Sequence, residues 1–240
     1  MQNLLKKCLI MGAAVLLFAP VWASSVPDTL EQRLAACSTC HGERGVGNPD
    51  NPHIPRLAEK PAGYLYKQLQ SFKAQQGQSP AMEYVVRQLS PSYMMKIAQY
   101  YSEQRVEYHE QQLPASITKE VLARGKQLVE EGDEARGVPA CKYCHGQALT
   151  GVKPMIPGIL NQPFDYVSTQ LNLWRTNSRS VESTHCMWVV AKRMMQKDVE
   201  AVSAYLAIQP LPADHSPIEL SALPNDLPGW CVLEESEVAY

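Results

Sequence analysis

The sequence predicts an all-α protein of two similar tandem domains followed by an irregular tail. Three observations support this prediction: a cysteine and histidine motif recurs once, apolar residues within each copy follow helical spacing, and no stretch alternates as a strand does. The 240 residues are enough for two domains of ordinary size. Hydrophobic residues make up 45% and charged residues 19% of the chain, which is typical of a globular protein.

The repeat is led by a hexapeptide. Cys37-Ser-Thr-Cys40-His41-Gly42 returns 104 positions later as Cys141-Lys-Tyr-Cys144-His145-Gly146. Ordered matches follow in both copies: Ile54-Pro55 with Ile156-Pro157, Tyr64 with Tyr166, Gln68 with Gln170, Phe72 with Trp174, Met82 with Met187, and Tyr100 with Tyr205. Such a long series of matches predicts two copies of one structural unit.

The repeat sets the expected domain boundaries. We expect a first domain over residues 24–113, a second over 114–209 and a tail over 210–240, because Pro114 and its neighbours interrupt the helical pattern. Within each domain we expect a first helix directly before the motif, a middle helix and a closing helix. The expected middle and closing helices cover residues 64–72 and 90–101 in the first domain, and 166–174 and 196–206 in the second.

The N-terminus is typical of a secretory signal. Lys6 and Lys7 precede an uncharged apolar run over residues 8–18, and Ala23 supplies a small residue at a cleavage site. We therefore expect residues 1–23 to be a signal peptide that directs the protein to the periplasm. The apolar run is shorter than the ~20 residues of a membrane span, although an uncleaved signal would leave a loose membrane association. The formal charge of −2 and the lack of a basic run exclude a nucleic-acid partner.

The Cys-x-x-Cys-His motif predicts covalent haem attachment. Two thiols at this spacing can reach both vinyl groups of one porphyrin, and the adjacent histidine then lies under the iron. The predicted attachment residues are Cys37 and Cys40 for one haem c and Cys141 and Cys144 for a second. The alternatives for these residues are a zinc site and a redox disulfide. A zinc site needs four ligands in one neighbourhood, and a redox disulfide of this spacing usually accompanies a βαβ pattern.

Methionine is the expected second axial ligand opposite each histidine. Met82 follows His41 by 41 residues and Met187 follows His145 by 42, so the two methionines hold equivalent places in the repeat. A thioether paired with histidine favours Fe(II) and is usual in electron transfer. His185 and Cys186 directly precede Met187, and the sequence leaves either of them open as a ligand of the second iron.

These doubled motifs resemble the two-domain, di-haem class I cytochromes c of the cytochrome c4 type, over residues 29–209. The resemblance implies two helical domains packed face to face, with the haem edges meeting near their interface. It implies a periplasmic protein that exchanges electrons with partner proteins such as a terminal oxidase or a dehydrogenase. It also implies that the carbonyls of Pro55 and Pro157 fix the orientation of the ligating histidines, as metal-bound histidines require.

The chain departs from this family in its tail and its extra cysteines. Residues 210–240 contain six acidic residues, five prolines and no Lys or Arg, so the tail is expected to be irregular, either as a solvated strap or as an acidic docking surface. Cys186 and Cys231 lie outside the haem motifs. In an oxidising compartment they are expected to pair, with two buried free thiols or a Cys186–iron bond as the alternatives.

Three functions are compatible with this sequence. The favoured one is an electron carrier, not an enzyme, that shuttles electrons between a donor and a terminal oxidase or reductase. The second is a haem enzyme of the thiosulfate dehydrogenase or peroxidase type, which needs an unusually ligated second haem. The third is a non-catalytic subunit held in a lasting complex with an oxidase or dehydrogenase, which differs from a carrier only in how long the complex lives.

Overall fold

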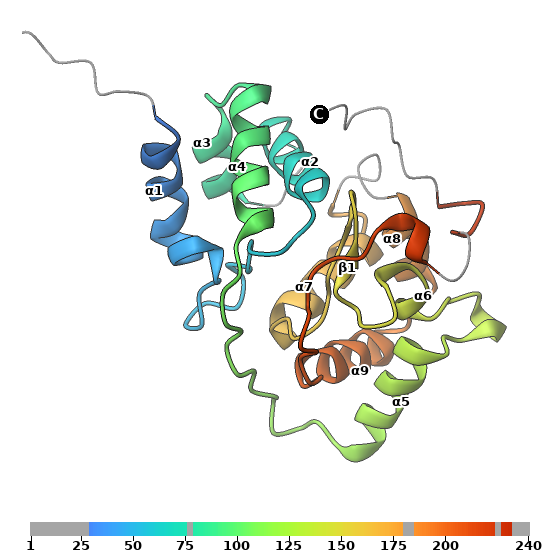
Figure 1. Cartoon of the computed structure of the whole chain (residues 1–240). Coiled ribbons are helices and arrows are strands. Elements are labelled where there is room, and N and C mark those ends of the chain that lie inside the picture. The colour runs from blue at the N-terminus through green and yellow to red at the C-terminus, as the bar shows by residue number, and fades with distance from the viewer. Residues whose placement is uncertain (1–28, 76–78, 180–184, 224–226, 232–240) are drawn as a thin grey trace, which may run out of the picture.

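The computed structural model describes residues 29–75, 79–179, 185–223 and 227–231 (Figure 1). The expected signal peptide, residues 1–23, lies outside the described residues. The described part is mostly helical, as the sequence predicts. Within these ranges no helix has both the length and the apolar character needed to cross a bilayer.

The first half is built from four α-helices. They are α1 (Leu30–His41), α2 (Ala62–Lys73), α3 (Pro80–Val86) and α4 (Pro91–Glu103), with a short 3-10 turn at Glu43–Gly45. Polar caps begin three of them, because the side chains of Thr29, Ser79 and Ser90 each accept a hydrogen bond from a backbone N–H in the first helical turn. Prolines at the start of α3 and α4 fit positions where no backbone donor is needed.

The second half repeats this order with additions. Its α-helices are α5 (Lys119–Glu130), α6 (Cys141–His145), α7 (Phe164–Arg175), α8 (His185–Arg193) and α9 (Gln196–Ala207). A 3-10 turn at Glu134–Arg136 precedes α6, and β1 (Gly151–Val152) pairs antiparallel with β2 (Ile156–Pro157). The middle and closing helices agree with the predictions in both halves.

The expectation that the first helix leads directly into each motif is wrong for the second half. In the first half α1 contains Cys37, Cys40 and His41, whereas α5 ends at Glu130 and the second motif lies on its own helix, α6. The intervening segment is held by Arg124, whose guanidinium bonds Asp133 at 2.6 Å and Asp198 of α9 at 2.9 Å. Gly132, Gly137 and Pro139 separate the apolar spacing of α5 from Cys141, and such residues mark a loop in the sequence.

Each half has its own hydrophobic core. The first core gathers Leu34 of α1, Leu65 of α2 and a cluster from α3 and α4 that includes Val86 and Ile97. The second core gathers buried residues from α5 to α9, such as Leu128, Leu171, Trp174, Val199 and Leu206. Two separate cores are consistent with two domains, and the exact boundary after residue 113 stays a prediction.

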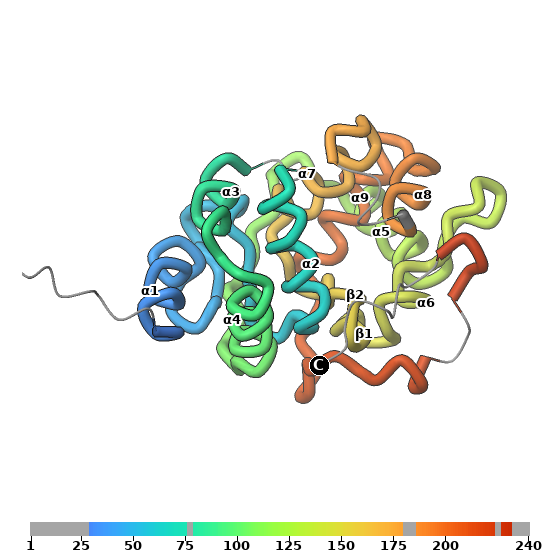
Figure 2. Tube along the Cα trace, turned by 90° about the horizontal axis from the view of Figure 1, so that it is seen from above, coloured from blue at the N-terminus to red at the C-terminus, as the bar shows by residue number. Residues whose placement is uncertain are grey.

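The two halves pack against each other through equivalent segments, and the views in Figures 1 and 2 place them side by side. Arg179 donates to the side-chain oxygens of Gln68 on α2 and Gln170 on α7, which are equivalent residues of the repeat. The backbone N–H of Tyr64 also donates to the Pro154 carbonyl, at 3.2 Å. The matched helices α2 and α7 therefore meet across a pseudo-symmetric interface.

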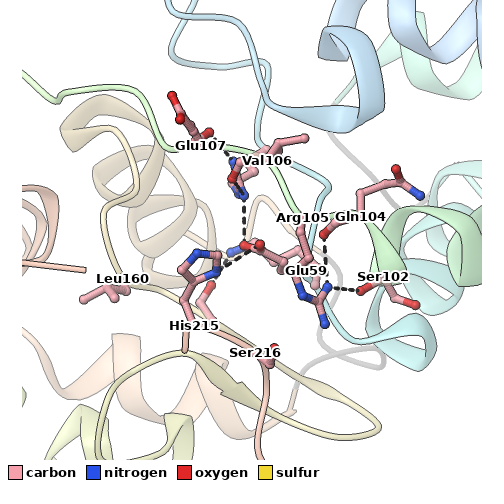
Figure 3. Close-up of polar contacts among 12 residues, drawn as sticks. Glu59, Ser102, Gln104, Arg105, Val106, Glu107, Leu160, His215 and Ser216 are labelled. Carbon is pink, nitrogen blue, oxygen red and sulfur yellow. Dashed lines mark hydrogen bonds and ion pairs between the residues drawn. The ribbon is translucent and has the colours of Figure 1, made fainter. Parts of the chain in front are cut away.

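The described part of the tail packs against both halves. Ile218 donates its N–H to the Gly151 carbonyl at 3.0 Å and accepts from the Lys153 N–H at 2.8 Å, which adds the tail beside β1. Three residues before Ile218 in the chain, His215 Nδ1 lies 2.9 Å from a carboxylate oxygen of Glu59 in the first half (Figure 3). The tail is irregular, as predicted, with one 3-10 turn at Leu220–Ala222. These contacts contradict the solvated-strap reading for this segment.

Candidate functional site

Both motif histidines are buried and held by a proline carbonyl. His41 Nδ1 lies 2.9 Å from the Pro55 carbonyl oxygen, and His145 Nδ1 lies 2.8 Å from that of Pro157. Because a carbonyl only accepts, Nδ1 must carry the hydrogen in each ring, and Nε2 is left with its lone pair free. Burial lowers the pKa of both imidazoles, although the proline bonds oppose that shift. Each ring is thus prepared as a neutral metal ligand.

The motif cysteines lie beside these histidines as unpaired thiols. Helix α1 places Cys37 and Cys40 one turn apart, and α6 does the same for Cys141 and Cys144. Burial raises the pKa of Cys141 to about 12 and that of Cys144 to about 11, and it also raises the pKa of Cys37. A redox Cys-x-x-Cys pair usually accompanies a βαβ unit, and the described residues contain only two two-residue strands, so the redox-disulfide alternative finds no support here.

A single cavity of about 960 Å³ connects the two motifs. All four motif cysteines and both histidines line it, together with apolar side chains from α2, α4, α7 and α9. This volume is at the upper end of the ~300–1,000 Å³ typical of cofactor and ligand pockets. Two free imidazole nitrogens, two thiol pairs and an apolar lining fit two flat, hydrophobic, iron-containing groups such as haem.

The two candidate methionine ligands line the same cavity. Met82 lies on α3 and Met187 on α8, so both are carried by short helices that precede the closing helix of each half. Neither short helix is among the helices that the sequence predicts. By contrast, Met94 is only 2% exposed and belongs to the first core.

The tail forms part of the wall of the second site. Cys186, at the start of α8, is joined by a disulfide to Cys231, with their Cα atoms 4.7 Å apart. Trp230 and Cys231 both line the cavity, and the Trp230 ring lies 5.3 Å from the Arg193 guanidinium. The disulfide removes the Cys186 thiol as a competing ligand. This is the pairing that the sequence predicts for the two cysteines outside the haem motifs. Neither cysteine has a counterpart in the first half.

Sequence reasoning missed three residues of the site. Trp230 reaches it from the tail, Arg179 bridges the two halves, and Lys60 lines the cavity next to the second motif although it belongs to the first half. No local pattern identifies such residues, because long-range packing alone brings them there. A comparison of the two copies does single out Lys60, since the equivalent residue is the uncharged Gln162.

Comparison with known proteins agrees with this architecture. A family model for cytochrome c matches residues 32–116. The chain is 34% identical to a thiosulfate dehydrogenase electron acceptor of Thiomonas intermedia, covering 79% of this chain and 83% of that one. It is also 34% identical to cytochrome c4 of Stutzerimonas stutzeri, covering 72% and 84%.

A solved structure of the thiosulfate dehydrogenase TsdBA from Marichromatium purpuratum superposes with a TM-score of 0.67 at 30% identity. The match covers 76% of this chain but spans only about two fifths, 41%, of that one.

The fold and the doubled motif define a protein of tandem class I cytochrome c domains. The chain belongs to the cytochrome c family and is of the cytochrome c4 type. Members of this family carry covalently bound haem c and take part in electron transport, and both properties hold for this chain.

Proposed function

We propose that this protein is a periplasmic di-haem electron carrier. In this proposal Cys37 and Cys40 bind the first haem through thioether bonds, and Cys141 and Cys144 bind the second. The axial pairs are His41 with Met82 and His145 with Met187. The observation that carries the proposal is that both motifs open into one cavity that also contains both methionines.

Haem would supply a one-electron Fe(III)/Fe(II) couple at each site. The chain's own groups set the conditions for that couple. The carbonyls of Pro55 and Pro157 orient the histidine rings and keep their Nε2 atoms free. The sulfur atoms of Met82 and Met187 would favour Fe(II) because a thioether is a soft ligand. With a histidine and a methionine both bound, neither iron would keep an open position for a substrate, which suits a carrier better than an enzyme.

We infer that the donor is a thiosulfate dehydrogenase. This inference is supported by the relative from Thiomonas intermedia, which is described as the electron acceptor of that enzyme, and by the likeness to part of TsdBA. A terminal oxidase or reductase is the expected acceptor. Periplasmic location after export through residues 1–23 fits an enzyme and a carrier that meet outside the cytoplasm.

The partner assignment is tested by reduction of the carrier. Oxidised protein mixed with thiosulfate and a catalytic amount of thiosulfate dehydrogenase is expected to take up two electrons per chain, followed as growth of the reduced haem bands. Thiosulfate without the dehydrogenase is the control and should leave the bands unchanged. Failure of the complete mixture to reduce either haem would contradict this donor.

The enzyme alternative is tested by the same materials. A haem enzyme needs an open or unusually ligated iron, whereas the disulfide occupies Cys186 and Met187 lines the second site. We therefore expect the isolated protein to catalyse no transfer of electrons from thiosulfate to ferricyanide. Sustained turnover by the protein alone would favour the enzyme reading over the carrier.

The haem count has a direct test. Four thioether bonds should hold two haem groups through acid–acetone extraction, because extraction removes only non-covalent haem. Mass measurement of the extracted chain is expected to exceed the polypeptide mass by two haems. Changing Cys141 and Cys144 to alanine should reduce the excess to one, and a wild-type excess of fewer than two would contradict the proposal.

A further inference from the structure

Lys60 is a buried cation that crosses from the first half into the second site. Only 7% of its surface is exposed. Its Nζ donates to the carbonyl oxygen of Gly158, the residue that follows Pro157. Pro157 in turn holds the His145 ring. A single positive charge of the first half is thereby fixed beside the iron ligand of the second.

No carboxylate among the described residues pairs with this charge. The neighbouring Glu59 is already engaged by Arg56 Nη2 at 2.8 Å and by His215 at 2.9 Å (Figure 3). The Gly158 carbonyl is the one hydrogen-bond partner that the described ranges give to Lys60 Nζ, which leaves two of its three N–H groups for the cavity that it lines. Burial, followed by the charge of Arg56, lowers the Lys60 pKa to about 7, against the opposing charge of Glu59, so the side chain is a full cation only below that pH.

The repeat shows that this charge is an asymmetric feature. Glu59 and Asn161 have the same left-handed backbone, with φ values of 66° and 50°. Their N–H groups bond equivalent carbonyls at the ends of α4 and α9, those of Tyr101 and Leu206. Lys60 therefore occupies the place of Gln162, a neutral residue. The turn forms equally well in the second half with a neutral glutamine. The positive charge of Lys60 is therefore not needed to form the turn.

We propose that Lys60 sets the reduction potential of the second haem from across the domain interface and makes it higher than it would otherwise be. This inference rests on the proposed haem at His145. It assigns to one residue of the first half a positioning and electrostatic role at the second site, through its charge and its hydrogen bond to Gly158.

The physical reason is the charge change at the iron. An oxidised haem carries one more positive charge than a reduced haem, and a nearby buried cation disfavours the oxidised form. The Lys60 Nζ is bonded to the carbonyl oxygen of Gly158, one residue from the Pro157 carbonyl that holds the His145 ring, so its charge lies close to this ligand. Low exposure of Lys60 limits screening by solvent and salt.

The test replaces Lys60 by its counterpart in the other half. In the holoprotein below pH 7, where Lys60 is charged, Lys60→Gln is expected to lower the potential of the second haem and leave the first nearly unchanged. The expected change in the equilibrium constant for electron exchange between the two haems is on the order of tenfold. Potentiometric titration resolves the two one-electron steps, and Met82→Ala and Met187→Ala assign each step to a haem.

Two controls separate charge from packing. Lys60→Arg keeps the cation and should retain the wild-type potential of the second haem, while Lys197→Gln removes an exposed lysine of α9 and should change neither. An unchanged second potential in Lys60→Gln, with two haems and both methionine ligands intact, would overturn this inference and leave the proposed function standing. An equal loss in Lys60→Arg and Lys60→Gln would overturn it too, because packing would then explain the effect. A protein lacking the second haem would instead refute the proposed function.

Discussion

The proline carbonyls determine which nitrogen of each histidine is available. A neutral imidazole has one donor and one acceptor nitrogen, and the bonds of His41 to Pro55 and of His145 to Pro157 use the donor. Burial of the rings disfavours the doubly protonated cation. Iron binding at Nε2 would therefore need neither deprotonation nor rotation of the ring.

The methionine assignments predict two site-specific effects. Met82→Ala should remove the sulfur–iron band of the first haem and lower its potential by on the order of 0.1 V, because a soft ligand to Fe(II) is lost. Met187→Ala should do the same at the second haem. The measurement is the number of sulfur–iron bands per chain together with a potentiometric titration. Met94→Leu, a core substitution in the first half, is the matched control and should keep both bands.

These positions also show what a residue pattern can and cannot reveal. The motif residues and Met82 were found from spacing because each copy of the repeat validates the other. Lys60 and Trp230 were not found, since their place at the site depends on contacts with Gly158 and Arg193 that lie far away in sequence. A side chain brought in by tertiary packing leaves no local periodic signal.

At the scale of elements, a buried carboxylate organises the second half. Asp198 at the start of α9 is about 1% exposed and pairs with Arg124 of α5 at 2.9 Å and with Arg136 of the inserted segment at 2.5 Å. It also accepts the N–H of Met195 at 2.9 Å. Burial raises the pKa of Asp198, but this bond and the two arginines outweigh burial and hold the pKa below 3.8.

Asp198→Asn should destabilise the second half by about 3 kcal/mol, because two arginines lose their buried counter-charge. The depressed pKa means that the ion pairs stabilise the fold above pH 3.8 and that this contribution is lost as pH falls through the folded-state pKa. The difference in unfolding free energy between wild type and variant should therefore shrink in acid. Denaturant titrations at several pH values measure it.

The exposed pair of Lys153 and Glu219 provides the control for that measurement. Their side chains are 52% and 65% exposed at an N–O distance of 2.8 Å. Glu219→Gln should cost less than about 1 kcal/mol, since solvent screens such pairs. A cost for Asp198→Asn no larger than this, or one independent of pH, would contradict the assigned role of Asp198.

Helix length explains which elements the sequence predicts. The twelve- and thirteen-residue helices α2, α4, α7 and α9 agree with their predicted ranges because apolar residues recur over three turns. Helices α3 and α8 have seven and nine residues and were not predicted, although they carry Met82 and Met187. Two turns give too few repeats of the helical period to be distinguished from a loop.

In the whole molecule the interface between the halves is pseudo-symmetric, whereas the C-terminal tail covers mainly the second half. Equivalent helices and glutamines meet between the halves, whereas the described part of the tail packs beside β1 and α8 of the second half and contacts Glu59 and Tyr108 of the first. Exposure follows this asymmetry. Tyr84 and Val85 on α3 are 65% and 40% exposed, and their counterparts on α8 are more covered. The methionine helix of the first site, α3, is therefore more exposed to solvent than α8, the methionine helix of the second site.

The disulfide between Cys186 and Cys231 should be what holds the end of the tail against α8. Changing both residues to serine is expected to lower the stability of the second half by up to about 4 kcal/mol, the chain-entropy value for cysteines 45 residues apart. It should also weaken the Met187 sulfur–iron band, because Cys186 directly precedes this ligand on α8, while the Met82 band stays unchanged. Denaturant unfolding and absorption spectra of the double variant measure both effects. Wild-type protein treated with a dithiol should lose stability to a similar degree, and two titratable thiols in the unreduced protein would contradict the bond.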